Sequence, residues 1–168
     1  NRICVEYIVR KNIFENGLGV QYVSDGEFCA AAFACKTGDA NSAEQWLSRL
    51  RPPLTDAEAR NLALSRTYIE AMDARTFSLM RPDDAKLSLF VSRTTGAGLP
   101  VFSELIARLA RRGFKNLFLW TDIDCTWEWY PRHGFTLVEE DVYDAFSGDV
   151  PYRTFIFCKQ IRTETEAG

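Results

Sequence analysis

The sequence has few of the residues that build metal sites. It contains one histidine in 168 residues, and its five cysteines are dispersed, with no Cys-x-x-Cys pair. Because zinc sites are built from closely spaced cysteine and histidine ligands, we expect no metal. An odd number of scattered cysteines also argues against a disulfide framework and favours a reducing, cytoplasmic location.

Long apolar runs and a large excess of charge of either sign are missing as well. No stretch of about 18 or more apolar residues could span a bilayer, and the start of the chain has no signal-peptide pattern. The formal net charge of −3 gives no general attraction to phosphate backbones or anionic lipid. We therefore expect no nucleic-acid partner and no membrane partner. The chain begins with asparagine rather than methionine, and we expect a few native residues to precede it.

What the sequence does have is the composition of a globular protein. Hydrophobic residues make up 46% of the chain, aromatic residues 13% and charged residues 26%. A chain of this length buries roughly 70% of its unfolded surface on folding, so it can complete a core without disulfides or metals. We expect one domain over residues 1–168.

Patterns in the first part of the chain predict a helix followed by a hairpin. Apolar residues recur at mixed spacing in residues 3–14, which favours a helix there. Two apolar runs, at residues 20–23 and 28–35, flank Asp25-Gly26, a pair that readily adopts the positive φ of a tight turn. This arrangement predicts an antiparallel hairpin.

Two capping-box patterns then predict helices within residues 42–80. Ser42 is followed three positions later by Gln45, and Thr55 by Glu58. At this spacing the two side chains can each bond the backbone N–H of the other residue and so begin a helix.

From residue 86 onward the pattern predicts alternating strands and helices. The expected elements are a strand at 86–91, a helix at 100–112, a strand at 116–120, a short helix at 127–130, and strands from 135 and at 154–161. Two strands joined through a helix lie parallel in one sheet, whereas hairpin strands lie antiparallel. The sequence therefore predicts a mixed α/β sheet.

The turn between the strand at 86–91 and the following helix reads Arg93-Thr94-Thr95-Gly96-Ala97-Gly98. Such a turn presents backbone N–H groups and the positive end of a helix dipole, and glycine lets an anion approach closely. These are the features of a diphosphate cradle, although glycines in this place serve tight turning equally well. The turn is neither a P-loop nor a full Gly-x-Gly-x-x-Gly fingerprint, and a nucleotide-binding protein is the weaker interpretation.

A second motif, Tyr130-Pro131-Arg132-His133-Gly134-Phe135, leads into the next strand. Arg-x-x-Gly-x-Gly at a strand-to-helix turn, followed by Tyr-x-x-x-Gly-Phe, resembles the two signature motifs of the GNAT N-acetyltransferase superfamily. The resemblance covers residues 86–142, and more loosely the hairpin at 20–35. It implies a mixed, mostly antiparallel α/β sheet with one splayed parallel strand pair, helices on both faces and an extra helical segment at 42–80.

The resemblance also implies how the single domain is divided. We expect an N-terminal helix and hairpin at 1–41, a helical substrate-side segment at 42–80, a cofactor-binding core at 86–161 and a flexible tail at 162–168.

The function that the resemblance implies is N-acylation with acetyl-coenzyme A and no metal. A primary amine on a small molecule or a peptide would attack the thioester directly in a ternary complex. A homodimer would also be in keeping with the family. The alternative is a non-catalytic module of the same fold that binds acyl-coenzyme A or a protein partner.

Site residues follow from the resemblance position by position. Backbone amides of Thr94, Thr95, Gly96, Ala97, Gly98 and Leu99 would hold the diphosphate. Phe90 and Val91 would line the strand edge along the pantetheine arm, and Tyr130 would protonate the leaving thiolate. A phenol with a pKa of about 10 is close enough to a thiol for such a transfer. The cofactor-binding residues expected are Phe90, Val91, Arg93, Thr94, Thr95, Gly96, Ala97, Gly98, Leu99, Cys125 and Tyr130.

The sequence departs from the family pattern at two places. Only Ser92 separates Val91 from Arg93, so the turn is short. Where many members have an asparagine before the second motif, this chain offers Asp124, Cys125 or Thr126.

The general base stays open among several carboxylates at turns or strand ends. The amine must lose its proton before it attacks, commonly to a carboxylate. The candidates are Glu27, Asp84, Asp122 and Asp124, each of which could equally be a turn or capping residue.

Overall fold

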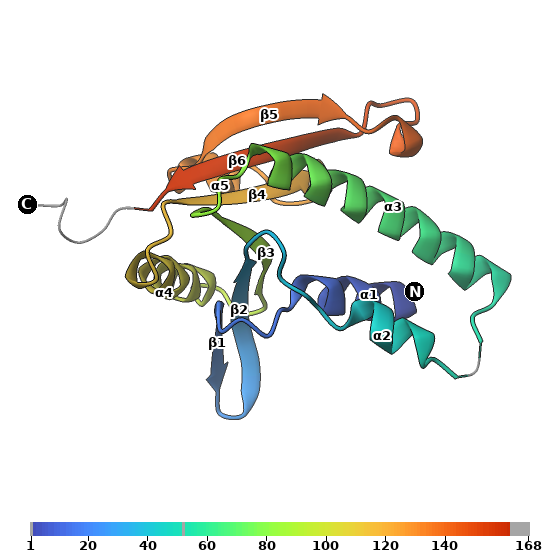
Figure 1. The fold of residues 1–168 in the computed structure, drawn as a ribbon, viewed down its shortest axis with the longest axis horizontal. Coiled ribbons are helices and arrows are strands. Elements are labelled where there is room, and N and C mark those ends of the chain that lie inside the picture. Colours follow the sequence, from blue (N-terminus) through green and yellow to red (C-terminus); the bar gives the residue numbers. More distant parts are fainter. Residues whose placement is uncertain (1, 52, 162–168) are drawn as a thin grey trace, which may run out of the picture.

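The computed structural model describes residues 2–51 and 53–161, so the tail predicted to be flexible lies outside the described residues. Figure 1 shows its helices and strands, coloured in chain order. They are α1 (Arg2–Asn12), β1 (Gly19–Ser24), β2 (Glu27–Cys35), α2 (Ala43–Ser48), α3 (Asp56–Leu79), β3 (Ala85–Ser92), α4 (Gly98–Arg111), β4 (Asn116–Asp122), α5 (Trp129–Arg132), β5 (Thr136–Val142), the 3-10 turn η1 (Asp144–Phe146) and β6 (Arg153–Gln160).

The strands form one six-stranded sheet in the order β1-β2-β3-β4-β6-β5. Neighbouring strands run antiparallel except β3 and β4, which run parallel because α4 connects them. The mixed, mostly antiparallel sheet with one parallel pair is therefore confirmed.

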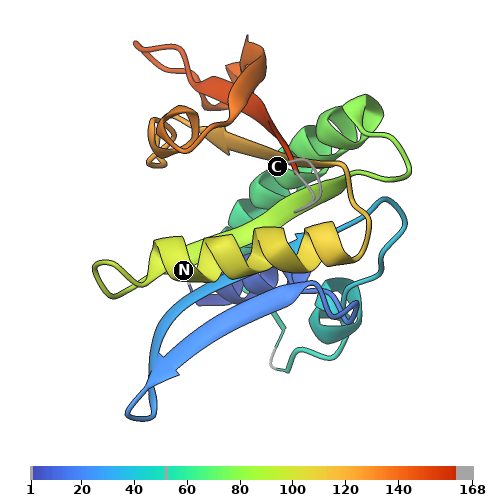
Figure 2. The same cartoon turned by 90° about the vertical axis from the view of Figure 1, so that its left-hand side faces the viewer.

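The parallel strands β3 and β4 part soon after they meet. Only Ala85 with Leu117, and Lys86 with Phe118, are paired between them. Beyond Lys86 the strands diverge, and the sheet separates into a β1–β3 half and a β4–β6 half (Figure 2). We call the space between the diverging strands β3 and β4 the opening. The carboxyl ends of β3 and β4 lie on the two sides of this opening.

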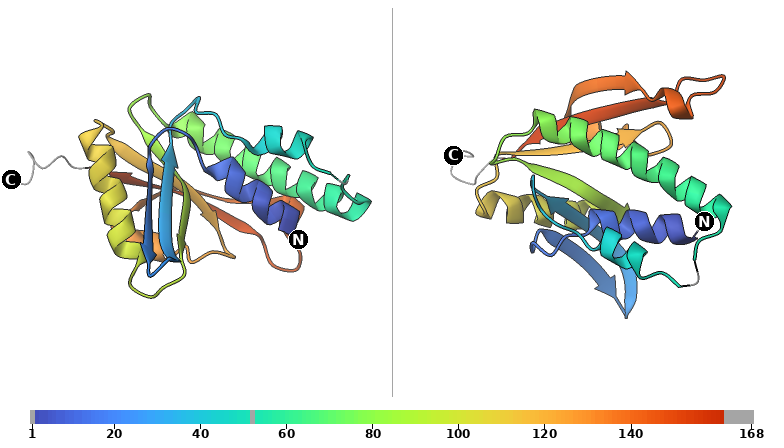
Figure 3. Two further views of the ribbon diagram at one scale, coloured as in Figure 1. Left: turned by 90° about the horizontal axis from the view of Figure 1, so that it is seen from below. Right: turned by 45° about the vertical axis from the view of Figure 1, so that its right-hand side comes forward.

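Helices cover both faces of the sheet, as expected (Figure 3). Helix α4 packs its apolar side, including Phe102 and Leu105, on the β1–β3 half, where the alanines of β2 leave room for it. On the opposite face, α3 packs Tyr68 and Met72 against Phe118 of β4 and Ile156 of β6. Helix α1 lies beside α3 on this second face.

The predicted turn and caps form with one exception. Asp25 and Gly26 both have positive φ, 53° and 80°, and close the β1–β2 hairpin. Thr55 and Glu58 form the predicted capping box at the start of α3. The box predicted at Ser42 is wrong, because the Ser42 side chain makes no cap hydrogen bond and the amide of Ala43 donates to the side chain of Asn41 instead.

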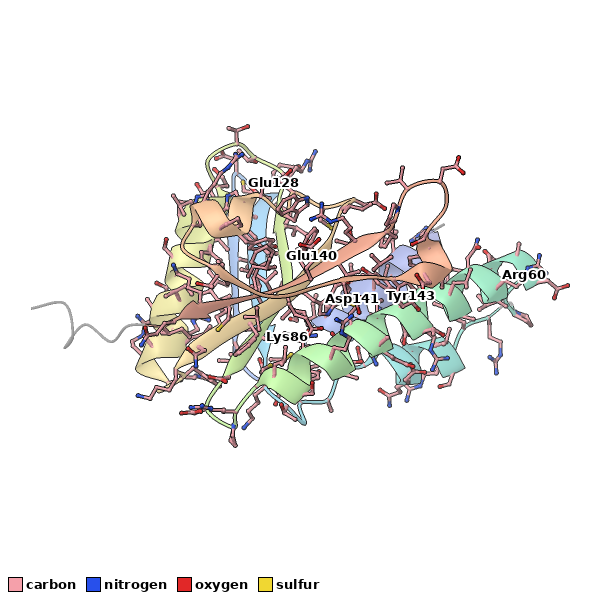
Figure 4. The ribbon with its side chains drawn as sticks, turned by 90° about the horizontal axis from the view of Figure 1, so that it is seen from above. Arg60, Lys86, Glu128, Glu140, Asp141 and Tyr143 are labelled. Atoms are coloured by element: carbon pink, nitrogen blue, oxygen red, sulfur yellow. The ribbon has the colours of Figure 1, made fainter. Side chains whose placement is uncertain are left out.

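The 24-residue helix α3 extends well past the sheet. In Figure 4, Arg60 lies at the end of α3 that is far from Lys86. No helix among the described residues is both long and apolar enough to cross a bilayer.

Candidate active site

The glycine-rich turn uses part of its own backbone to close on itself. The amides of Arg93 and Thr94 both donate to the carbonyl of Cys29 on β2, at 2.8 and 3.3 Å, and the amide of Ala97 donates to the carbonyl of Thr94. Two of the six amides predicted to bind a diphosphate, those of Thr94 and Ala97, are therefore engaged within the turn.

The other four predicted donors remain available at the start of α4. Within the part of the chain that the structure describes, the amides of Thr95, Gly96, Gly98 and Leu99 donate to no acceptor. The cap residue Ala97 has no side chain that could satisfy them. Four such amides at the positive end of a 14-residue helix have the geometry and the polarity that suit an anion.

The two glycines of the turn are needed for different physical reasons. Gly96 has a φ of +84°, which residues with a side chain rarely adopt, and a Cβ there would meet no atom within 4 Å. At Gly98 a Cβ would lie 3.2 Å from both the Phe90 ring and the Ser92 Cβ, so glycine lets α4 begin close against β3. Space for a ligand is therefore found at Gly96, while Gly98 serves packing.

The arginine that opens the motif points away from the turn. The Arg93 side chain is 71% exposed and pairs with Glu27 at 3.4 Å. Such an exposed pair contributes little stability. Glu27, one of the predicted general-base candidates, is thereby placed at the hairpin turn beside the glycine-rich turn.

Strand β3 presents a free edge along the opening. From Leu87 to Ser92 it pairs with β2 but not with β4, so an extended arm could add to that edge. The pairing register shifts by one residue at Ser88, whose hydroxyl lies within hydrogen-bonding distance of the carbonyls of Asn12 and Phe33. No sequence pattern indicated this bulge.

The predicted strand-edge residues lie on that free stretch. The Phe90 ring lies under α4, 5.7 Å from the ring of Phe102 and 5.3 Å from the ring of Trp129. Val91 is more exposed, at 38%. Trp129 contacts both β3 and α4, and sequence reasoning had assigned it no role.

Tyr130 occupies the short helix α5 on the α4 side of the sheet. Its half-buried ring packs against Phe135 and Phe157 at 5.5 and 5.9 Å. Burial, and then the nearby thiol of Cys125, raise the pKa of Tyr130 to about 12. The phenol therefore keeps its proton at neutral pH, which suits an acid.

The Tyr-x-x-x-Gly-Phe spacing has a local explanation. The amide of Phe135 donates to the carbonyl of Tyr130 at 3.1 Å, which closes the end of α5. The chain reverses direction after α5, and this turn needs the positive φ of Gly134, +80°. A Cβ at Gly134 would lie 2.7 Å from the Lys159 ammonium. The motif thus sets the position of the Tyr130 ring.

The four carboxylates predicted as possible bases lie in different places. Asp84 is buried in the turn before β3, where it accepts from the Arg81 amide and from Asn116 at the start of β4. It is therefore at the closed end of the strand pair, far along the sheet from the opening. Asp122 and Asp124 stand at the other end, at and just after the carboxyl end of β4.

Comparisons with known proteins agree with this geometry. No protein-family model and no curated protein matches the sequence significantly. Solved structures do match, among them the ribosomal-protein-S18-alanine N-acetyltransferase from Escherichia coli, with 16% identity, a TM-score of 0.54 and coverage of 90% of this chain and 74% of that one. Ard1 from Thermoplasma volcanium matches with 11% identity, a TM-score of 0.53 and coverage of 94% and 78%. Aminoglycoside 6'-acetyltransferase type Ii matches with 14% identity, a TM-score of 0.51 and coverage of 89% and 73%.

The chain has the GNAT fold. The resemblance carried by the two sequence motifs is confirmed at this level, including the splayed strand pair with the glycine-rich turn at the end of its first strand.

On the second face of the GNAT sheet, Asp122 is hydrogen-bonded to Tyr68, a contact that no sequence pattern predicted. Asp122 is only 6% exposed and accepts hydrogen bonds from the Tyr68 hydroxyl at 2.8 Å and the Asp124 amide at 3.1 Å. Burial, followed by the bond to Asp122, raises the pKa of Tyr68. Tyr68 comes from α3, 54 positions earlier in the chain, a distance over which local patterns carry no information.

The ring of Tyr68 is surrounded by four others. Ring centroids of Trp120, Tyr143, Phe146 and Tyr152 lie between 4.8 and 6.0 Å from it. Three of these belong to the segment that joins β5 to β6. In Figure 4, Tyr143 lies beside α3, in agreement with these contacts.

Cys125 lies between the two faces of the site. Its backbone is engaged, because its amide donates to the Asp122 carbonyl and its carbonyl accepts from the Trp127 amide. Its exposed thiol contributes to the raised pKa of both Tyr130 and Tyr68, which belong to opposite faces. Its exposed side chain is available to contact a cofactor.

A pocket of about 740 Å³ lies away from these residues. It is lined by residues of α1, of the segment 13–16 and of the segment 39–45, and none of the predicted site residues lines it. The candidate site is therefore defined by the opening between β3 and β4 and not by this pocket.

Proposed function

We propose that the protein is an acetyl-coenzyme A-dependent N-acetyltransferase whose acceptor is a primary amine. The observation that carries the proposal is the combination of an open β3 edge with four free amides at the end of the same strand. A diphosphate on the turn and a pantetheine arm along β3 would bring a thioester into the opening.

The residues present fit this ligand. The open space at Gly96 and the uncapped start of α4 suit an anion with many oxygen atoms. Acetyl-coenzyme A would supply an activated acetyl group. Backbone N–H groups on the β3 edge would hold the thioester oxygen and stabilise the charge that develops on it during attack.

Tyr130 would act as the acid for the leaving group. It lies on the same face as α4 and close to Cys125, at the end of the opening. Because its raised pKa keeps the phenol protonated, it can donate to the sulfur as the carbon–sulfur bond breaks.

The acceptor would approach from the face of α1 and α3. Two of the structural neighbours are named for a ribosomal-protein alanine and for an aminoglycoside, so this fold serves amines of very different size. We therefore propose only a primary amine on a small molecule or peptide, attacking directly in a ternary complex.

Titration calorimetry with acetyl-coenzyme A tests the proposal. Gly96→Glu places bulk and negative charge on the turn and should abolish binding. Gly38→Glu is the matched control, because Gly38 also has a positive φ, +90°, and open space around it. If the wild-type protein binds no acyl-coenzyme A, the proposal is wrong; binding without transfer to any amine would favour the non-catalytic module.

A further inference from the structure

The end of β4 separates the two faces of the site. Along this strand Leu117 and Leu119 belong to the core under α4, whereas Phe118 and Trp120 contact the side chains of α3. Asp122 follows in the second series, and its bond to Tyr68 confirms that it faces α3. Tyr130 lies in the core on the α4 side. The Asp122 carboxylate and the Tyr130 phenol therefore lie on opposite faces of the sheet, near the carboxyl end of β4.

Asp122 is a buried carboxylate with no cation of its own. No Lys, Arg or His nitrogen lies within 4.0 Å of it among residues 2–51 and 53–161. By contrast, Asp73 of α3 pairs with Lys86. A buried charge that is held only by neutral donors is costly, and an ammonium ion entering beside it would compensate it.

The groups that face Asp122 come from three segments. They are the Tyr68 hydroxyl from α3, the Tyr152 hydroxyl from the segment before β6, and Asp124 and the Cys125 thiol from the loop after β4. None carries positive charge. Neutral phenols orient the carboxylate without satisfying its charge, and the surrounding ring faces favour a cation.

Resting on the function proposed above, we infer that Asp122 is the general base that receives the acceptor as an ammonium ion and takes its proton. The proton passes from the ammonium nitrogen to a carboxylate oxygen of Asp122. The free amine then forms a bond to the thioester carbon, the carbon–sulfur bond breaks, and the departing sulfur takes a proton from Tyr130. Once its bond to carbon has formed, the nitrogen gives up a second proton through water, and this proton restores the phenol of Tyr130. The products are a neutral amide and a free thiol, and Asp122 returns the first proton to solvent.

The other carboxylates fit this role less well. Asp84 lies at the closed end of the strand pair, and Glu27 is paired with Arg93 at the hairpin turn. Asp124 is exposed, with water to compensate its charge. Tyr68 acts through Asp122 and is a positioning residue.

The test compares Asp122→Asn with the control Asp56→Asn, which changes an exposed carboxylate in the first turn of α3. Thiol release from acetyl-coenzyme A is followed with n-butylamine, the simplest ammonium ion with an apolar body. At about pH 7 we expect Asp122→Asn to be at least ~100-fold slower than wild type, and Asp56→Asn to be within a few-fold. The deficit should shrink about tenfold per pH unit toward pH 9, as the fraction of unprotonated amine rises.

Two further measurements separate chemistry from structure. The side-chain amide that Asp122→Asn introduces can still accept from Tyr68, so the variant should keep its melting temperature and its affinity for acetyl-coenzyme A. Tyr68→Phe should lower kcat, but by less than Asp122→Asn does. The pH dependence of its rate should remain that of the wild-type protein. If Asp122→Asn had the wild-type rate, or a deficit that is the same at every pH, the inference about Asp122 would be wrong and the proposed function would still stand. Failure of the wild-type protein to bind acetyl-coenzyme A would overturn the proposed function and the inference together.

Discussion

The ammonium group of Lys86 pairs with the carboxylate of Asp73 at the point where β3 and β4 part. Lys86 is 1% exposed and is the last residue of β3 to pair with β4. The same Asp73 oxygen accepts from the Trp120 indole at 2.7 Å, so a single side chain of α3 binds both diverging strands. This contact sets the apex of the opening.

We expect Asp73→Ala to be strongly destabilising. Removing one partner of a buried ion pair leaves the other charge uncompensated, which costs about 3–5 kcal/mol. Urea unfolding measures the loss, with Glu104→Ala as a control because that carboxylate is exposed and pairs only with arginines of its own helix. A loss as small as that of the control would show that the pair does not hold the strands. Replacing both partners, as Lys86→Met with Asp73→Leu, should recover part of the stability.

Tyr130→Phe should lower turnover while leaving the affinity for acetyl-coenzyme A unchanged. The substitution removes one oxygen from a ring that is otherwise held by Phe135 and Phe157, so the packing is preserved. Loss of a general acid lowers kcat by roughly 100-fold. Stopped-flow rates and titration calorimetry measure the two quantities, with Tyr22→Phe on the exposed face of β1 as control. Equal turnover in both variants would remove Tyr130 from the mechanism.

The sequence could predict the fold because its signals are local. The Asp25-Gly26 turn, the Thr55–Glu58 box and the strand-turn-helix pattern around Gly96 each depend on residues a few positions apart. Ser42 shows the limit of such patterns, because its side chain makes no cap hydrogen bond and the neighbouring Asn41 accepts from the Ala43 amide instead.

The acceptor side of the site could not be predicted in the same way. Tyr68 meets Asp122 across 54 positions, and the buried Lys86 meets Asp73 on another element. A lysine within an apolar strand is a visible exception in the sequence, but its partner depends on how α3 crosses the sheet. Motifs could indicate the proposed cofactor side because that side is built from one continuous segment.

Binding of acetyl-coenzyme A should change the fluorescence of Trp129. The Trp129 indole contacts Phe90 on the β3 edge and stacks at 3.8 Å on His133, so an arm laid along β3 must alter its surroundings. We expect a saturable change with the same midpoint as calorimetric binding, lost in Trp129→Phe and retained in Trp46→Phe. Trp46 packs beside α1, away from β3. A change that disappears only with Trp46→Phe would place the ligand elsewhere.

Stability should fall as the pH rises above about 10, in part because of Tyr7. The Tyr7 ring is fully buried and its hydroxyl donates to Glu44 at 2.7 Å. Burial, and then this hydrogen bond, raise the pKa of Tyr7 to about 12. Because an unfolded tyrosine titrates near pH 10, the folded protein binds more protons between about pH 10 and 12, and its unfolding free energy falls with pH in that window. Tyr7→Phe should reduce this slope by at most about 1.4 kcal/mol per pH unit, as measured by urea unfolding, whereas the exposed Tyr22→Phe should leave it unchanged. An identical slope in Tyr7→Phe and wild type would mean that Tyr7 ionises equally easily in the folded protein.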